Sequence, residues 1–273
     1  MSTNLSYYAA PELYFQEPNI RVRLEKIEEA VHRSLTKPAS FLIPLEAQRD
    51  IQVLPLKDHP PKVGFSKIHG QGRLLHDLAN IELQAMELGL RTLVEFPQAP
   101  EKFRDELAQI TLEEASHFDL CLMRLDDLGY KWGDWPIHTV LWDAVSVQDS
   151  LLDRIFIVHR YLEGSGLDAG DIFTRKLSGV LDSRIEKTVK KITDDEIDHV
   201  YFGSAWYNKL CLQNEIHPNQ DLIFRSKKLR HRLPKRIEKI CHKLRLQAGF
   251  SPCDLETFEN LRESFLGPKL AFS

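Results

Sequence analysis

Cysteine is scarce in this chain of 273 residues, and its four copies lie too far apart to form a short motif. No Cys-x-x-Cys spacing occurs, which excludes the common thiolate zinc sites. A disulfide framework is not expected either, because such frameworks belong to short secreted chains that are rich in cysteine. We interpret all four as reduced thiols and expect a cytoplasmic protein: Cys121, Cys211, Cys241 and Cys253.

Long apolar runs are also missing. No stretch approaches the roughly 18 consecutive apolar residues that a membrane-spanning helix needs. Residues 1–20 lack the basic start and the apolar core of a secretion signal. We therefore expect no membrane partner.

Alternation of apolar and polar residues, which is typical of a half-buried strand, is rare too. From about residue 70 onward, apolar residues recur at helical spacing. One such stripe consists of Leu74, Leu75, Leu78, Ile81, Ala85 and Leu88. The length suits one elaborated domain with a sizeable core. We predict an all-α fold in which a four-helix bundle lies between N- and C-terminal helical extensions.

The chain divides into three predicted parts. Residues 1–66 hold one amphipathic helix, at 20–35, and a wrap over 37–66 whose five prolines exclude a helix. Residues 67–215 form the bundle, and residues 216–273 form a basic C-terminal extension. The bundle helices are expected at 68–96, 101–128, 138–163 and 183–212.

Glutamate and histidine recur in an order that indicates a two-metal site. Two Glu-x-x-His pairs, Glu114/His117 and Glu196/His199, place both side chains of a pair on one helix face. A lone glutamate precedes each pair: Glu82 lies 32 residues before Glu114, and Glu163 lies 33 residues before Glu196. The predicted metal ligands are therefore Glu82, Glu114, His117, Glu163, Glu196 and His199.

The equal spacing and the local sequences around both pairs indicate a duplicated helical hairpin. Thr111 stands three residues before Glu114, as Thr193 stands three before Glu196. Chance is the rival explanation, since a Glu-x-x-His pair also arises on ordinary charged helix faces with satisfied histidines. We interpret the third such pair, Glu29/His32, as an example of that kind.

The second hairpin is less regular than the first. Gly164 and Gly166 follow Glu163 directly, so we expect its helix to end or kink there, with a short extra helix at 171–178. Around the expected site, His76 and Asn80 are candidates for supporting the ligands. Tyr161, Tyr201 and Tyr207 lie near ligand positions but are interpreted as core or rim residues.

Residues 225–245 hold ten lysines and arginines but one glutamate, in a chain whose net charge is −4. Such a block can bind a nucleic acid or another anionic surface. It can equally be a solvated helix that pairs with acidic residues of the bundle. No aromatic residues are interleaved with these charges, which favours the second interpretation.

The ligand order resembles that of the ferritin-like di-iron carboxylate superfamily. Over about residues 65–212, four segments look like a bacterial ferritin-like family of unknown function: Leu78–Leu88, Glu113–His117, Gly133–His138 and Asp195–His199. That family often has a histidine where this chain has Asn80. A more distant similarity links it to a bacterial hydroxylase of isopentenylated adenosine in tRNA. The resemblance implies a helical bundle with a two-metal site, and it implies no substrate.

Carboxylate and imidazole ligands without thiolate suit iron or manganese. We predict an oxidoreductase or oxygenase that activates O₂ with two iron ions and acts on a small-molecule or RNA-borne substrate. A di-manganese peroxide-dismutating enzyme, a ferroxidase and a metal-free helical scaffold are the alternatives. A homodimer is possible, and so is nucleic-acid binding through residues 225–245.

Overall fold

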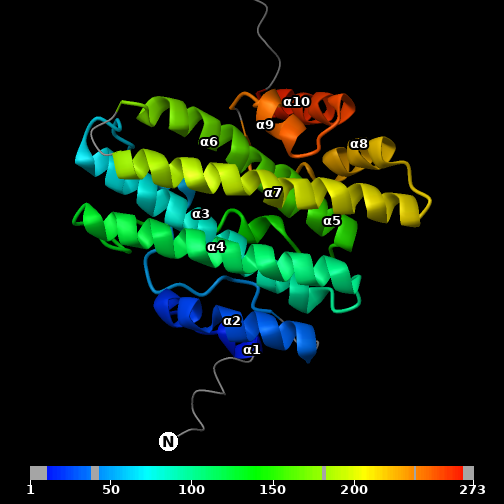
Figure 1. Cartoon of the computed structure of the whole chain (residues 1–273), viewed down its shortest axis with the longest axis horizontal. Helices are drawn as coiled ribbons and strands as arrows, with labels where there is room; N and C mark the ends of the chain where they lie inside the picture. The colour runs from blue at the N-terminus through cyan, green and yellow to red at the C-terminus, as the bar shows by residue number, and fades with distance from the viewer. Residues whose placement is uncertain (1–10, 38–42, 180–182, 237, 267–273) are drawn as a thin grey trace, which may run out of the picture. The chain divides into compact units, whose positions relative to one another are not determined.

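The computed structural model describes residues 11–37, 43–179, 183–236 and 238–266, and helices dominate their regular secondary structure (Figure 1). Within them the sole β-type pairing is an isolated parallel bridge between Val53 and Ile137. The predicted all-α class is confirmed. No described helix combines the length and the apolar character that crossing a bilayer requires.

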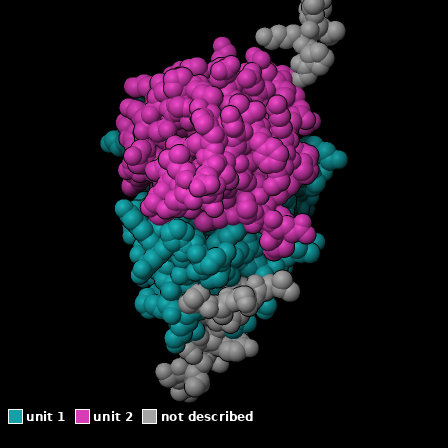
Figure 2. Space-filling view, turned by 90° about the vertical axis from the view of Figure 1, so that its right-hand side faces the viewer, with its two compact units in different colours: residues 1–143, 179–188 teal, residues 144–178, 189–273 magenta. Residues whose placement is uncertain are grey.

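The chain forms two compact units, which Figure 2 distinguishes by colour. Unit 1 comprises residues 1–143 and 179–188, and unit 2 comprises residues 144–178 and 189–273. The long helix α7 (Ser183–Gln213) contributes its first six residues to unit 1 and the rest to unit 2.

Unit 1 is built on the antiparallel hairpin of α3 (Ile68–Glu95) and α4 (Glu101–Asp127), which pack along their length (Figure 1). Both helices lie within one residue of their predicted bounds. Pro100 precedes α4 directly, where proline's fixed φ suits a helix start. Helix α2 (Ile20–Thr36) packs on this hairpin, and the Asn19 side chain caps its N-terminus by accepting from two backbone N–H groups.

The remaining segments of unit 1 are short or extended. Helix α1 spans Pro11–Tyr14, and the 3₁₀ turn η1 spans Leu56–Asp58. Residues 43–66 form no α-helix, as their prolines predict. The indole of Trp142, within the 3₁₀ turn η2 (Trp142–Ala144), donates to the Leu45 carbonyl and ties this segment down.

Unit 2 corrects the predicted third bundle helix. That helix does not run from 138 to 163: it begins at Leu151, where Ser150 and Asp153 form a reciprocal capping box. It continues through α5 (Leu151–Ile155), a π-helix η3 (Phe156–Glu163) and α6 (Gly164–Leu177) without a break. The prediction of a short separate helix at 171–178 is therefore also wrong, because these residues belong to α6 up to Leu177.

The two glycines after Glu163 do not end the helix, and Gly164 has a packing reason. A Cβ on Gly164 would lie 2.9 Å from Nη1 of Arg245, whose guanidinium packs against the helix there. The glycine therefore makes room for a buried arginine, and the helix continues through it without a turn. Three further helices complete unit 2: α8 (Pro218–Leu229), α9 (His242–Gln247) and α10 (Pro252–Leu266).

Candidate metal centre

Unit 1 brings together three of the predicted ligands. Glu82 projects from α3, and Glu114 and His117 project from adjacent turns of α4. The Nδ1 atom of His117 lies 3.6 Å from an oxygen of Glu82 and 3.6 Å from an oxygen of Glu114. All three side chains are buried, with at most 2% of each residue exposed. We name these residues cluster 1.

The separations in cluster 1 fit ligands of one metal ion better than hydrogen-bonded partners. A protein N–H···O bond spans about 2.7–3.2 Å between heavy atoms. Two atoms that each bind one ion at about 2.1 Å lie roughly 3.0–3.6 Å apart at angles between 90° and 120°. The donor atoms of cluster 1 all lie within 4.8 Å of one another, so they can surround a cation.

The electrostatics of cluster 1 also call for a positive charge. Burial by itself lowers the pKa of His117, but the carboxylates of Glu114 and Glu82 outweigh it and raise the pKa to about 11. Without a metal the cluster thus holds a proton on this imidazole. Burial raises the pKa of the Cys121 thiol well above its usual value, so without a metal this thiol adds no negative charge beside Glu82.

Unit 2 holds the other three predicted ligands in two separate contacts. Nδ1 of His199 lies 3.5 Å from an oxygen of Glu196 on α7, the same kind of separation as in cluster 1. Glu163, the last residue of η3, instead accepts a 2.8 Å hydrogen bond from Nδ1 of His159. We name these four residues cluster 2. Each is at most 9% exposed.

Helix packing within unit 2 places η3 against the ligand face of α7. The His159 ring meets Phe202 edge-on, with centroids 5.0 Å apart, and its Cβ lies against Gly203. Gly203 follows His199 by one helical turn, so both belong to one face of α7. Glu163 and His159 therefore lie along the face of α7 that carries His199.

The sequence analysis missed His159. Its signal is a His-x-x-x-Glu spacing, which places the imidazole one turn before Glu163. In the π-helix that connects them, with its i→i+5 bonding, residues four apart still lie nearly above one another. Short π-helical segments are frequent at functional sites.

Other candidates from the sequence lie elsewhere. His76 stacks on Trp132 at 5.0 Å between ring centroids, and it accepts a hydrogen bond from the Gly133 N–H. Its pKa is lowered to about 4, chiefly by burial. Asn80 donates to the backbone carbonyl of His138. Both therefore fix the segment that follows α4.

The tyrosines have structural contacts. The Tyr161 hydroxyl donates to the Pro234 carbonyl, and the Tyr207 hydroxyl donates to Asp221 at 2.5 Å. Burial raises the pKa of Tyr161 to about 12. Tyr201 is 54% exposed. These contacts match the predicted core and rim roles.

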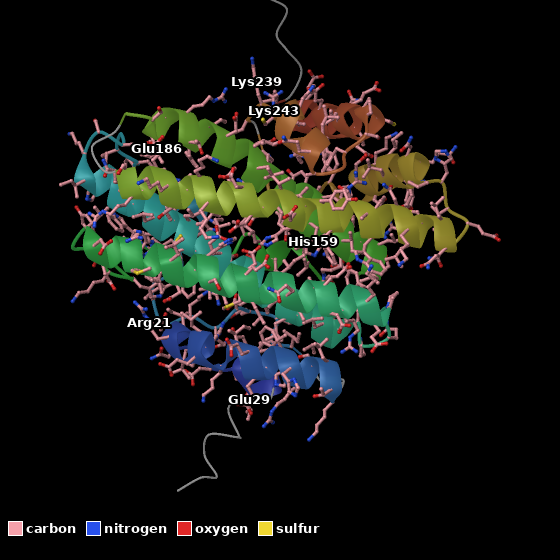
Figure 3. The ribbon with its side chains drawn as sticks, in the orientation of Figure 1. Arg21, Glu29, His159, Glu186, Lys239 and Lys243 are labelled. Carbon is pink, nitrogen blue, oxygen red and sulfur yellow. The ribbon has the colours of Figure 1, made fainter. Side chains whose placement is uncertain are left out.

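The third Glu-x-x-His pair is a surface feature of α2. Glu29, which Figure 3 labels, forms an ion pair with Arg33. His32 is exposed. This supports its interpretation as an ordinary charged helix face.

The basic segment is partly neutralised within unit 2. Arg225, Lys228, Arg232 and Arg245 each form an ion pair with an aspartate of that unit. Lys239 and Lys243 lie on its exposed surface (Figure 3). These four of the ten basic side chains thus form ion pairs within the unit that carries them.

Comparison with known proteins gives a family but no activity. A family model described as "Protein of unknown function (DUF455)" matches residues 16–256. An uncharacterized protein of Haemophilus influenzae is 32% identical over 214 residues, which cover 72% of this chain and 70% of that protein. No solved structure gives a significant match.

Proposed function

The chain belongs to the DUF455 family of proteins of unknown function, and we propose that it is a two-metal oxidoreductase that uses iron to activate O₂. One observation carries the proposal. Each unit gathers buried glutamate and histidine side chains whose Glu–His separations of 3.5–3.6 Å suit a shared cation. We propose that cluster 1 and cluster 2 each hold one metal ion.

The donor set fits iron. It consists of carboxylate oxygens and imidazole nitrogens, and the buried thiol nearest to it stays protonated. Six ligands from two Glu-x-x-His pairs and two lone glutamates are the set that ferritin-like di-metal bundles use. Manganese accepts the same donors, so metal analysis has to distinguish the two.

His117 with its neighbouring glutamates would hold one metal ion, and His199 with Glu196 and Glu163 would hold the other. Iron bound there would supply electrons for the reduction of O₂. The helices keep the ligands in place, because each lies in the middle of a helix with its side chain buried. Burial also excludes water, which strengthens each electrostatic interaction at the site.

Metal content tests the proposal directly. Protein purified without a metal-binding tag should contain about two iron ions per chain by elemental mass spectrometry, after anaerobic Fe²⁺ reconstitution where needed. Glu114→Ala and His199→Ala should each lose metal. The neighbouring substitutions Glu113→Ala and Asp198→Ala are matched controls, since Glu113 is half-buried and Asp198 is exposed, and both should retain metal.

Each other outcome favours a different function. Manganese in place of iron would favour peroxide dismutation, and oxidation of Fe²⁺ with storage of the product would favour a ferroxidase. No metal after reconstitution would leave a helical scaffold and overturn the proposal. An RNA-borne substrate predicts RNA affinity that falls steeply as salt rises.

A further inference from the structure

The two units repeat more than their ligand spacing. Five residues after the lone glutamate, each unit has a buried carboxylate that binds arginine: Glu87 in unit 1 and Asp168 in unit 2. Two residues further on, each has a glycine, Gly89 or Gly170. Aligning the two frames therefore identifies which residue of unit 2 corresponds to which residue of unit 1.

The packing of these glycines is the same in both units. A Cβ on Gly89 would collide with Oγ1 of Thr111, and a Cβ on Gly170 would collide with Oγ1 of Thr193. Both threonine hydroxyls donate to the carbonyl four residues earlier, over 2.7 and 2.8 Å. The two helix pairs thus meet at equivalent points. Residues near these contacts can therefore be compared position by position between the two units.

Two differences between the units lie next to the predicted ligands. Four residues before the lone glutamate, unit 1 has Leu78 and unit 2 has His159. Four residues after the paired histidine, unit 1 has Cys121 and unit 2 has Gly203. A Cβ on Gly203 would collide with Cβ of His159, so the glycine makes the room that the imidazole needs. The two exchanges are therefore coupled in space.

The polar contact of His159 is directed at Glu163. Nδ1 lies 2.8 Å from the carboxylate, a hydrogen-bond distance that is shorter than the 3.5–3.6 Å separations of His117 and His199 from their glutamates. Among the described residues Nε2 has no hydrogen-bond partner, although His159 is 1% exposed. Burying a polar ring in this way costs free energy. Its contact with Glu163 is the polar interaction that holds it there.

We propose that His159 is a positioning residue: its Nδ1–H donates to Glu163 and orients that carboxylate, so that cluster 2 binds its metal differently from cluster 1. This inference rests on the proposed function. Hydrogen bonds from outside the ligand set fix ligand orientation, and their loss typically lowers metal affinity about 10–100-fold. Unit 1 has the apolar Leu78 at the corresponding place, and this side chain can donate no such hydrogen bond.

Three substitutions of His159 separate this role from others (Figure 3). His159→Leu installs the residue of unit 1 and removes the hydrogen bond. His159→Asn places an amide N–H near the position of Nδ1 and can still donate to Glu163. His159→Gln places its amide near the position of Nε2 and cannot replace Nδ1. His76→Leu is the control for exchanging a buried histidine that does not contact a predicted ligand.

Anaerobic titration with Co²⁺, followed by its visible absorption, measures both metal positions. Wild-type protein and His76→Leu should bind two Co²⁺ per chain. His159→Leu and His159→Gln should keep one position unchanged, weaken the other about 10–100-fold and alter its absorption band. His159→Asn should stay within about threefold of wild type.

The outcomes distinguish the two proposals. Two tight positions in His159→Leu, with wild-type absorption, would overturn the role of His159 and leave the two-metal site standing. Equal weakening in the Asn and Leu variants would overturn it as well, because the ring would then act as a ligand and not through its Nδ1–H. Absence of Co²⁺ and Fe²⁺ binding in the wild type would overturn the proposed function itself.

Discussion

The α3–α4 hairpin of unit 1 and the η3–α6–α7 segment of unit 2 have the same sequence frame but differ in the helix that carries the lone glutamate. In unit 1, Glu82 lies inside a regular α-helix of 28 residues. In unit 2, Glu163 ends an eight-residue π-helix. The glycine–threonine contacts beyond these glutamates are equivalent. A repeated scaffold therefore holds two ligand sets whose immediate surroundings differ.

The comparison separates two kinds of residue: those that set the distance between helices and those that surround the lone glutamate. Residues that fix the distance between helices are the same, because any larger side chain at Gly89 or Gly170 would separate the pair. Residues around the lone glutamate are different, as Leu78 and His159 illustrate. The two clusters can therefore differ although the glycine–threonine contacts beside them are alike.

The buried carboxylates Glu87 and Asp168 should give the largest effects when changed. Each anchors the terminal extension of its own unit: Glu87 binds Arg23 and Arg49, and Asp168 binds Arg245 and the Cys241 N–H. Removing one partner of a buried ion pair costs about 3–5 kcal/mol. We expect Glu87→Gln and Asp168→Asn to lower the free energy of unfolding by this amount in urea titrations.

Glu87 serves two buried arginines and Asp168 serves one, so Glu87→Gln should cost more. Asp171→Ala is the control, because its ion-pair partner Arg175 is largely exposed and the pair should contribute less than about 1 kcal/mol. If Glu87→Gln cost no more than Asp171→Ala, the anchoring role of this carboxylate would be refuted.

The close helix contacts should give the next largest effects. Gly89→Ala and Gly170→Ala each force a methyl group against a threonine, and overpacking of this kind costs about 1–3 kcal/mol. Adding Thr111→Ala should recover most of the loss in unit 1, since its own Cβ would remain 3.2 Å from the new methyl group.

Recovery should be smaller in unit 2, where Thr193→Ala still leaves a Cβ 3.0 Å away. Double-mutant cycles from urea titrations measure both coupling energies. Additive effects in either unit would contradict the equivalence of the two contacts.

Periodicity in the sequence was sufficient for α3, α4 and α7, where apolar stripes are long and prolines mark the turn at residues 96–100. Periodicity did not predict the helix that continues past Glu163, because tertiary packing decides the conformation there. Gly164 accommodates Arg245, which lies 81 positions later in the chain. The Ser-x-x-Asp spacing of Ser150 and Asp153 is a helix-start signal in the sequence, and it predicts a helix start near residue 151 in place of 138.

The candidate ligands follow from spacing along single helices, whereas the position of His159 depends on packing between helices. Glu114/His117 and Glu196/His199 are pairs within one helix, so their spacing specifies their geometry. The room for His159 depends on Gly203 of another helix. Only the helix packing reveals that the two exchanges between the units belong together.

Acid should reveal the smallest difference between the units, through His76 of unit 1. Its counterpart in the aligned frame of unit 2 is Ile157, which does not titrate. Burial lowers the pKa of His76 to about 4, below the value of about 6.5 in an unfolded chain. The unfolded state therefore binds more protons between these values, and stability is present above pH 6.5 and lost as the pH falls towards 4.

At pH 5 this linkage should amount to no more than about 2 kcal/mol relative to pH 7, because one pKa unit corresponds to about 1.4 kcal/mol. His76→Phe keeps a ring against Trp132 and removes the titration. Urea titrations at both pH values should give a smaller loss in the variant than in the wild type. Equal losses would mean that His76 is protonated as easily in the folded chain as in the unfolded one, and that its burial against Trp132 does not make unit 1 sensitive to acid.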